Sequence, residues 1–400
     1  MGELMTGREA AGRLKVGISV TTIQGGRSGV GVYIFGLIEG LRKAAPEIEI
    51  HLFGRRSDQR HFEKWKDSVR WHSVPDFCSN GVLDILWHHL VLLPRMWILG
   101  IQVVHIPTYR RSLAFAPCVE VLTVHDLAPF HVKRKYSLLR MFYARRVVPF
   151  LVRRAARIMT VSRATREDVL KFCGVDEGKV AAVYNGIDHS VFRPSAAGAR
   201  RFEFPYFLYI ARLEHPAKNH IRLIEAFELF HQRTGGKSPH RLVLGGADWH
   251  GADEIHARIR SSSVKDRIVV LGFVDAAELP ALYREAEALV FPSLFEGFGL
   301  PLIEAMACGC PVISSTQGSL DEVLGEVGVR IDPFSPPDMA AALQRVAGFS
   351  PEERAAAISS GISRAGEFDW ELCGEAAART YRMAAGEVED CPSPGAASMR

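Results

Sequence analysis

Residues 291–311 read FPSLFEGFGLPLIEAMACGCP, and this stretch joins the end of an apolar strand to the start of a helix. Pro301 occupies a favoured position in the first helical turn, and Gly309 is the residue type that most often follows a helix end. A helix that begins at a glycine-bearing loop presents unpaired N–H groups and the positive end of its dipole. We therefore expect a phosphate site at the mouth of this helix, formed by Gly297, Phe298, Gly299 and Leu300.

The same stretch carries two glutamates eight positions apart, Glu296 on the loop and Glu304 inside the helix. Carboxylates accept hydrogen bonds from hydroxyl groups, in which sugars and riboses are rich. The stretch resembles the Glu-x7-Glu motif of the family 4 retaining glycosyltransferases (glycosyl transferases group 1, with mannosyltransferases among them), which have the two-domain GT-B architecture. The resemblance implies that Glu296 contacts the donor sugar and that Glu304 contacts the ribose of its nucleotide.

Apolar strand-like runs alternate with helix-like stretches on both sides of this motif, which is the pattern of parallel sheets covered by helices. A linker over 185–205, rich in glycine, proline and small residues, separates two such series. We predict an α/β fold of two Rossmann-like, doubly wound domains, 14–197 and 205–366, that face each other across a cleft. The resemblance implies that a helix at 367–385 returns to the first domain, and the polar tail at 386–400 is expected to be disordered.

Length and composition agree with two globular domains, because 400 residues exceed the usual size of a single core and 48% of them are apolar. Seven scattered cysteines fit reduced thiols in a cytosol. The first residues lack the apolar segment of a secretory signal, and no run of 18 apolar residues occurs, so a cytoplasmic location is expected. A net charge of +4 argues against nucleic-acid binding.

Two cations, Arg212 and Lys218, follow the predicted strand 206–210 and precede a helix. Taken alone they are typical solvated charges. A departing nucleoside diphosphate builds up negative charge, however, and fixed cations that face this charge lower the barrier. The resembled family carries an Arg and a Lys six apart in this position, which implies that Arg212 and Lys218 hold the leaving group. Ala211 stands where family members often have glycine.

A glycine-rich turn, residues 25–31 with the sequence GGRSGVG, follows the first predicted strand. It lacks the third glycine and the acidic partner of the dinucleotide fingerprint, so an NAD site is not expected. The resemblance implies that Gly29 and Gly31 bring backbone N–H groups to the donor. The alternative is that these glycines serve only a tight turn.

Two further segments end predicted strands. His125 follows the strand 119–124, and the resemblance implies that it contacts the donor sugar near the acceptor; the alternative is a structural histidine. Asp126 either orients this imidazole or caps the next turn. Phe273 and Val274 lie in a segment where the nucleobase meets backbone groups in the resembled family.

The sequence contains no Asp-x-Asp motif and no His, Cys and carboxylate cluster with metal-ligand spacing. We therefore predict a metal-independent enzyme without a cofactor, in which Arg212, Lys218 and the helix mouth neutralise the diphosphate. The resemblance favours attack on the same face from which the diphosphate leaves.

Nine basic and no acidic residues lie between His131 and Arg157. Arg146, Arg153 and Arg157 have spacings that can share a helical face, which leads to the hypothesis of a contact with an anionic membrane that holds a lipid-linked acceptor. The alternative is an ordinary basic surface helix. A separate apolar stretch, 85–106, is interrupted by polar residues and is expected to form a buried or interfacial helix.

The predicted function is the retaining transfer of a hexosyl group from a nucleotide-sugar, with GDP-mannose as the first candidate, to a glycan or lipid-linked acceptor. The alternatives are a nucleotide-sugar epimerase, a glycoside phosphorylase, or a protein that binds nucleotide-sugars without catalysis.

Overall fold

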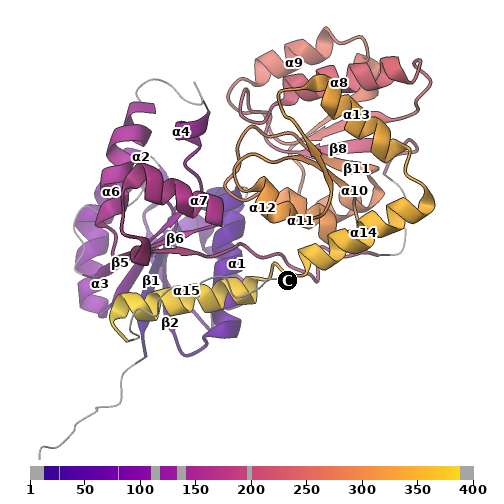
Figure 1. Cartoon of the computed structure of the whole chain (residues 1–400). Coiled ribbons are helices and arrows are strands. Elements are labelled where there is room, and N and C mark those ends of the chain that lie inside the picture. The colour runs from indigo at the N-terminus through magenta and orange to yellow at the C-terminus, as the bar shows by residue number, and fades with distance from the viewer. Residues whose placement is uncertain are drawn as a thin grey trace, which may run out of the picture.

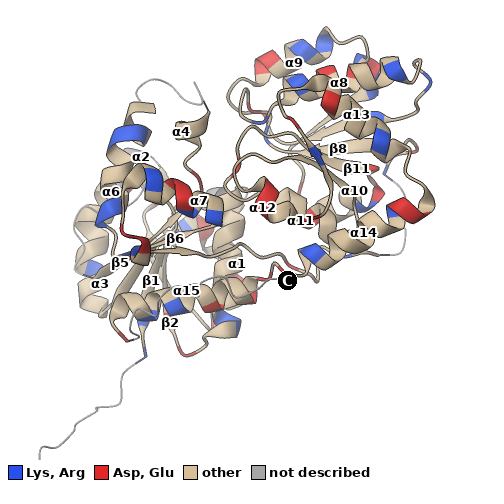
Figure 2. Ribbon diagram, in the orientation of Figure 1, with Lys and Arg blue, Asp and Glu red and all other residues tan. Residues whose placement is uncertain are grey.

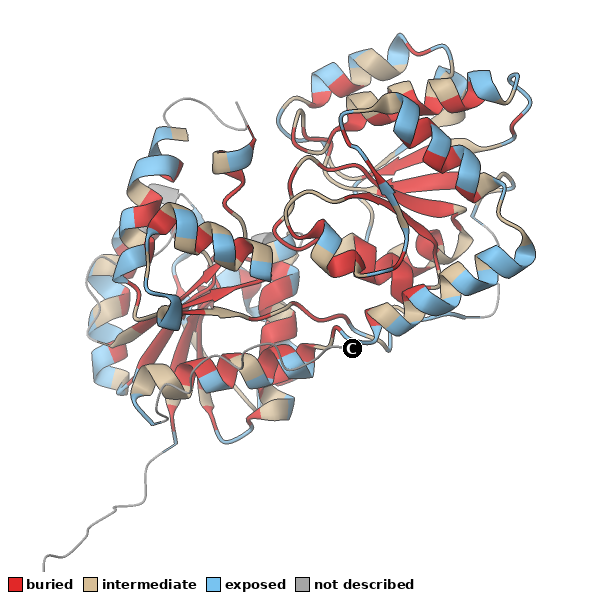
Figure 3. Cartoon of the chain, in the orientation of Figure 1, coloured by how far each residue is buried: buried red, intermediate tan, exposed pale blue. Residues whose placement is uncertain are grey.

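The computed structural model describes residues 13–26, 28–79, 81–109, 118–132, 141–195 and 201–387. In these ranges the chain forms two lobes, each built on one parallel sheet (Figure 1). Figure 3 shows that the strands of both sheets are largely buried, whereas the helices are exposed on their outer sides. The predicted disorder of the tail from 388 onward lies outside the described residues, and so do four of the nine basic positions, Lys133, Arg134, Lys135 and Arg140.

The first sheet has seven strands in the order β3-β2-β1-β4-β5-β6-β7. The strands are β1 (Lys15–Ser19), β2 (Glu49–Arg55), β3 (Arg70–Val74), β4 (Val103–Ile106), β5 (Val119–Val124), β6 (Arg157–Thr160) and β7 (Val180–Ala182). Val16 on β1 is in register with Ile50 on β2 and with Val103 on β4, and all pairings are parallel. The chain order reverses between β1 and β4, and this reversal is the point at which doubly wound sheets bind ligands.

Helices cover both faces of the first sheet. The helical segments before the linker are η1 (Gln24–Gly26), α1 (Gly29–Ala44), η2 (Arg56–Trp65), η3 (Asp76–Ser79), α2 (Gly81–Trp87), η4 (His88–Leu92), α3 (Leu93–Leu99), α4 (Ala128–His131), η6 (Tyr143–Val147), α6 (Val148–Arg154), α7 (Arg163–Asp168), η7 (Val169–Cys173) and η8 (Glu177–Lys179). The apolar side of α1 packs into one core with the C-terminal helix α15 (Trp370–Ala385). Side chains of η4, α3, α6 and η7 form a second core, with Leu92, Met96, Val148 and Val152 among its members.

The second sheet has six parallel strands in the order β10-β9-β8-β11-β12-β13. The strands are β8 (Tyr206–Ile210), β9 (Arg241–Gly245), β10 (Ile268–Gly272), β11 (Ala288–Phe291), β12 (Val312–Ser315) and β13 (Val329–Ile331). Its helices are α8 (His220–Arg233), α9 (Ala252–Arg260), η9 (Lys265–Arg267), α10 (Leu279–Glu285), α11 (Leu300–Ala307), α12 (Leu320–Leu324), α13 (Pro336–Ala347) and α14 (Pro351–Ala365). Here the chain order reverses between β8 and β11. The predicted class of fold, two doubly wound α/β units, is confirmed.

The C-terminal helix α15 crosses from the second lobe to the first, as expected (Figure 1). Glycines allow its close approach to α1: a Cβ on Gly40 would lie 1.8 Å from the carbonyl oxygen of Trp370, and a Cβ on Gly374 would lie 2.1 Å from the carbonyl carbon of Gly40. Farther along α15, the Tyr381 hydroxyl lies 2.8 Å from Nδ1 of His105 on β4. The last helix is therefore part of the first lobe's structure.

Two details of the predicted elements were wrong. Strand β3 was not expected, because Arg70–Val74 is an edge strand without an apolar run. Arg157 begins β6, whereas the preceding helix ends at Arg154, so Arg146, Arg153 and Arg157 do not share a helical face. No helix in the described part of the chain combines the length and the apolar character needed to span a membrane.

Candidate active site

The loops after β8 and β11 carry the predicted site of the second lobe. These two strands are neighbours, with Leu208 opposite Leu289, and they flank the point where the strand order reverses. Their carboxyl ends therefore bring residues 211–219 and 292–299 together, although about eighty positions separate the loops in the sequence.

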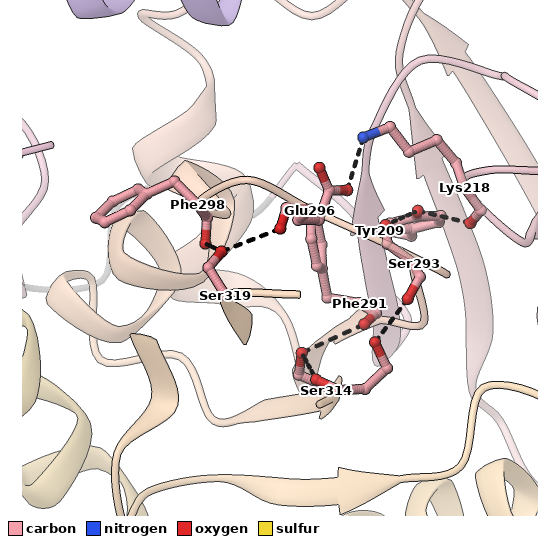
Figure 4. Close-up of polar contacts among 9 residues, drawn as sticks. Tyr209, Lys218, Phe291, Ser293, Glu296, Phe298, Ser314 and Ser319 are labelled. Carbon is pink, nitrogen blue, oxygen red and sulfur yellow. Dashed lines mark hydrogen bonds and ion pairs between the residues drawn. The ribbon is translucent and has the colours of Figure 1, made fainter. Parts of the chain in front are cut away.

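Lys218 and Glu296 form an ion pair between these loops, with Nζ of the lysine 2.6 Å from Oε1 of the glutamate. Their side chains are only 21% and 14% exposed, so the pair is shielded from solvent but still reachable. Figure 4 shows the lysine reaching toward the carboxylate.

Buried hydroxyl groups fix both members of the pair. The Tyr209 hydroxyl on β8 donates to the Lys218 carbonyl at 2.7 Å and lies 3.1 Å from the Ser293 hydroxyl (Figure 4). Ser319 donates its backbone N–H and its hydroxyl to the Glu296 carbonyl, at 3.1 and 3.2 Å. These hydrogen bonds fix the backbone of both loops at Lys218 and Glu296, and so they position the two side chains.

The mouth of α11 follows directly. Gly299 precedes the helix with a φ of 99°, a left-handed conformation that favours glycine, and it offers no side chain to cap the first N–H groups. Phe298 is buried, and its ring packs toward Tyr184 and Phe368, away from Lys218. Phe298 can therefore contact a ligand only through its backbone groups.

Arg212 and Glu304 lie apart from the ion pair. The Arg212 guanidinium stacks over the ring of Trp249, 4.5 Å from its centre. Glu304 is buried and accepts a hydrogen bond from the Tyr283 hydroxyl through Oε2 at 2.8 Å. Burial raises the pKa of Glu304 to about 7, and the hydrogen bond from Tyr283 opposes this shift. Within the described ranges, neither residue forms an ion pair with Lys218 or Glu296.

Phe273 and Val274 follow β10 at the same edge of the sheet. The Phe273 ring is exposed, and Gly272 before it has a φ of 68°. Val274 packs toward Gly245 at the end of β9, where an added Cβ would lie 3.0 Å from the valine. The Phe273 ring thus lies at the carboxyl end of β10, partly exposed to solvent.

The glycine-rich turn of the first lobe opens α1. Ser28 caps this helix by accepting a hydrogen bond from the Gly31 N–H at 3.1 Å. A Cβ on Gly31 would lie 2.9 Å from the Ile23 carbonyl oxygen, so this glycine is needed for close packing, whereas a Cβ on Gly29 would meet nothing within 4 Å. Only Gly29 therefore has open space beside it.

His125 follows β5 and is held on two sides. Its Nε2–H donates to the Pro107 carbonyl at 2.8 Å, and the Tyr33 ring meets it edge-on at 4.8 Å. Burial lowers the pKa of His125, which favours the neutral ring, and in that form Nδ1 is an acceptor. Asp126 caps the next turn, because its Oδ1 accepts the Ala128 N–H at 2.9 Å.

The two lobes touch at these residues. A Cβ on Gly297 would lie 1.7 Å from the His125 carbonyl oxygen, and the Gly297 carbonyl accepts a hydrogen bond from Thr165 at 3.3 Å. Phe295 stacks on His131, with ring centres 4.2 Å apart. The predicted residues Glu296, Gly297 and His125 therefore belong to one region, formed by both lobes.

Several supporting residues were missed from the sequence. Four of them contact predicted site residues: Tyr209, Tyr283, Trp249 and Ser319. A fifth, Glu322 on α12, joins the lobes, because its carboxylate accepts hydrogen bonds from the backbone N–H groups of Arg163 and Ala164 at the start of α7, at 2.8 and 3.0 Å. Only Ser319 and Glu322 lie in a segment with a recognisable sequence pattern. The three aromatic residues look like ordinary core or surface positions until the fold is known.

No group of three His, Cys, Asp or Glu residues in the described part of the chain is arranged to hold a metal ion. The six cysteines placed by the structure are free thiols.

Two doubly wound lobes, with the candidate site residues on loops at the carboxyl ends of their strands, are the architecture of the GT-B glycosyltransferases. The family model described as Glycosyltransferase Family 4 matches residues 27–191, and the model described as Glycosyl transferases group 1 matches residues 204–348. The chain belongs to this family and is a glycosyltransferase that uses a nucleotide-sugar. The expected retention and metal independence are consistent with that family.

Two sequence relatives are bacterial mannosyltransferases. The O-antigen chain mannosyltransferase B of Escherichia coli is 30% identical over 271 residues, which cover 66% of this chain and 70% of the relative. The O-antigen chain mannosyltransferase RfbU of Salmonella typhimurium is 30% identical over 214 residues, or 54% of this chain and 57% of the relative.

Solved structures support the fold. A sucrose-phosphate synthase from Thermosynechococcus elongatus matches with a TM-score of 0.75 at 20% identity, covering 94% of this chain and all of that chain. HepE of Anabaena in complex with UDP and glucose matches with a TM-score of 0.72 at 20% identity, covering 92% of this chain and 99% of that chain.

Proposed function

We propose that the chain is a retaining, metal-independent transferase that moves a hexosyl group, with mannosyl as the first candidate, from a nucleoside diphosphate sugar to a polysaccharide precursor or a lipid-linked acceptor. The observation that carries the proposal is the Lys218–Glu296 pair beside the mouth of α11. One member suits the diphosphate and the other suits sugar hydroxyls. The names of the two O-antigen relatives favour mannose.

In this proposal the donor diphosphate lies between Lys218, Arg212 and the backbone of Gly297–Leu300. Glu296 accepts hydrogen bonds from the sugar, and Phe273 and Val274 border the base. Tyr283 holds Oε2 of Glu304, which leaves Oε1 to accept from a ribose hydroxyl. From the first lobe, Gly29 and Gly31 approach the donor and His125 approaches the sugar. The domain limits at 197 and 205 also stay a prediction.

The proposed reaction is a same-face displacement. The acceptor oxygen forms a bond to the anomeric carbon while the bond from that carbon to the phosphate oxygen breaks. The bonding electron pair stays on the phosphate, which also takes the proton of the acceptor hydroxyl. Lys218 and Arg212 stabilise the charge that develops there, as preorganised cations do in other phosphate-releasing sites. Fixed cations and the helix mouth can supply the neutralising charge, so we propose that no metal or cofactor takes part.

Donor consumption with and without acceptor tests this function. A transferase consumes donor at a much higher rate with its acceptor, whereas an epimerase converts the donor without one, a phosphorylase consumes or forms sugar phosphate, and a binding protein consumes nothing. A thermal-shift panel of GDP-, UDP- and ADP-sugars identifies the donor first, because a ligand that binds the native state raises its unfolding temperature. Any acceptor-independent conversion at the full rate contradicts the proposal.

We propose that this reaction takes place in the cytoplasm, and at the inner face of a membrane when the acceptor is lipid-linked.

A further inference from the structure

Exposed large apolar side chains gather on one part of the first lobe. Among the described residues, ten of the seventeen such side chains lie on or beside two helical segments: Phe77, Leu83, Leu86, Leu90, Val91, Trp97, Ile98, Phe142, Tyr143 and Phe150. Scattered single residues of this kind need no explanation, but a concentrated set marks an interaction surface.

The first segment runs from α2 through η4 to α3. Its buried side carries Asp84, His88, Leu92 and Met96, spaced four apart, and its outer side carries Leu83, Leu86, Leu90 and Trp97. Leu90 is 70% exposed and Trp97 is 75% exposed. The buried side, which also holds Trp87, packs into the core, so the segment presents large apolar side chains on its solvent side as well, where a typical surface helix is polar.

Polar contacts under the helix fix this orientation. The Ser19 hydroxyl lies 2.8 Å from Nε2 of His88, and the Thr21 hydroxyl donates to Asp84 at 3.2 Å. Both contacts are buried at the end of β1. The leucines consequently stay outward, because turning them inward would break two buried polar contacts.

The second segment, η6 and α6, adds positive charge. Residues 141–154 contain four arginines, Arg145, Arg146, Arg153 and Arg154, and no acidic residue, and the α6 region shows blue positions in Figure 2. Arg145 and Arg153 donate to the backbone carbonyls of Pro129 and Cys173, contacts that do not neutralise their charge. Leu92 and Met96 share a buried core with Val148 and Val152, so both segments cover the same face of the first sheet.

We propose that this docking face, made of Leu86, Leu90, Trp97, Ile98, Phe142 and Phe150 with the four arginines, binds the surface of an anionic lipid bilayer. The apolar side chains enter the boundary between headgroups and acyl chains, and the arginines meet the lipid phosphates. The excess of cations favours an anionic lipid surface as the partner. A second copy of this chain would place the same positive charges opposite one another, and these charges would repel. Membrane binding does not depend on the proposed transfer reaction. The further idea that the bound membrane supplies a lipid-linked acceptor does rest on the proposed function.

Vesicle flotation of the full chain tests the proposal. We expect binding to phosphatidylcholine vesicles that contain phosphatidylglycerol, weaker binding to phosphatidylcholine alone, and a loss of binding with rising salt. Leu90→Asp should weaken binding about 10-fold or more, since burial of one leucine contributes roughly that factor. Arg146→Gln should weaken it about 5-fold, and only toward anionic vesicles. Leu372→Asp, an exposed leucine on α15, is the matched control and should change nothing.

Trp97 provides a site-specific readout. Brominated lipids should quench the fluorescence of the wild-type chain, and Trp97→Phe should remove most of that quenching. A donor-induced thermal shift measured on the same variants shows whether the transferase site is intact, which separates failure of docking from failure of the proposed function. Absence of vesicle binding by a correctly folded wild-type chain overturns the proposal, and so does a dimer in light scattering that Leu90→Asp converts to monomer without any lipid effect.

Discussion

Lys218 Nζ lies 2.6 Å from Glu296 Oε1, and this contact joins two loops whose strands are neighbours in the second sheet. The ion pair holds each of the two side chains in place. A donor with a diphosphate and sugar hydroxyls offers each member a partner of the required polarity. In the proposed function the two residues separate to bind opposite ends of the donor's reacting group.

Replacement of Lys218 by alanine should reduce kcat about 10²–10³-fold, because one fixed charge that stabilises the leaving phosphate is lost. Steady-state kinetics with the identified donor and acceptor measure this effect. Lys265→Ala is the control, since Lys265 lies exposed in the same lobe. Turnover near that of the wild type would show that Lys218 does not serve the leaving group.

Glu304 should make the stability of the protein depend on pH. Burial raises its pKa from 4.5 to about 7, so the folded chain favours the protonated form. That contribution to stability is fully present below pH 4.5 and is lost as the pH rises to about 7. Relative to the wild type, Glu304→Gln should therefore gain roughly 3 kcal/mol in the free energy of unfolding over this range.

Urea denaturation at several pH values measures the difference. Glu326→Gln, at an exposed position, should show a flat difference across the same range. If the curves for Glu304→Gln and the wild type run parallel from pH 4.5 to 7, the carboxyl titrates normally in the folded protein.

Gly297→Ala should prevent the observed contact between the lobes. The added Cβ would lie 1.7 Å from the His125 carbonyl oxygen, so the loop or the lobe must move. We expect kcat/KM to fall about 100-fold or more, since misplacement of reacting groups by about 1 Å has effects of that size. Small-angle scattering should show a larger radius of gyration. Gly348→Ala, which meets no atom closer than 3.4 Å, is the control, and an unchanged radius with full activity would contradict the prediction.

Tyr381→Phe should destabilise the first lobe by about 1–3 kcal/mol, because Nδ1 of the buried His105 loses its partner. Burial lowers the pKa of His105 to about 3. The ring therefore stays neutral at neutral pH, and protonation of Nδ1 cannot replace the lost hydrogen bond. Chemical denaturation measures the loss. In a double-mutant cycle with His105→Leu, the combined cost should be smaller than the sum, whereas strict additivity would mean that the two residues do not interact.

Local sequence patterns are enough to predict the secondary structure elements and the class of fold. Alternating apolar strands and helices specified two doubly wound lobes, and the stretch 291–311 specified a strand, a loop and a helix, because hydrophobic period, proline and glycine act over a few residues. Strand β3 was not predicted, because an edge strand such as RWHSV does not need the apolar run by which buried strands are recognised. The suggested helical face of Arg146, Arg153 and Arg157 was wrong because the basic run continues past the helix end at Arg154 into the next strand.

Contacts between residues that are distant in the sequence depend on how the strands and helices pack. The sheet order put Lys218 beside Glu296, the chain's return placed Tyr381 on His105, and the packing of α10 against α11 buried Glu304 under Tyr283. It also left Leu90 and Trp97 outward, although a sequence pattern alone treats such residues as core. The reason is physical: periodicity assigns a residue to a face, whereas the neighbours of that face are set by strand order and helix packing across the whole chain.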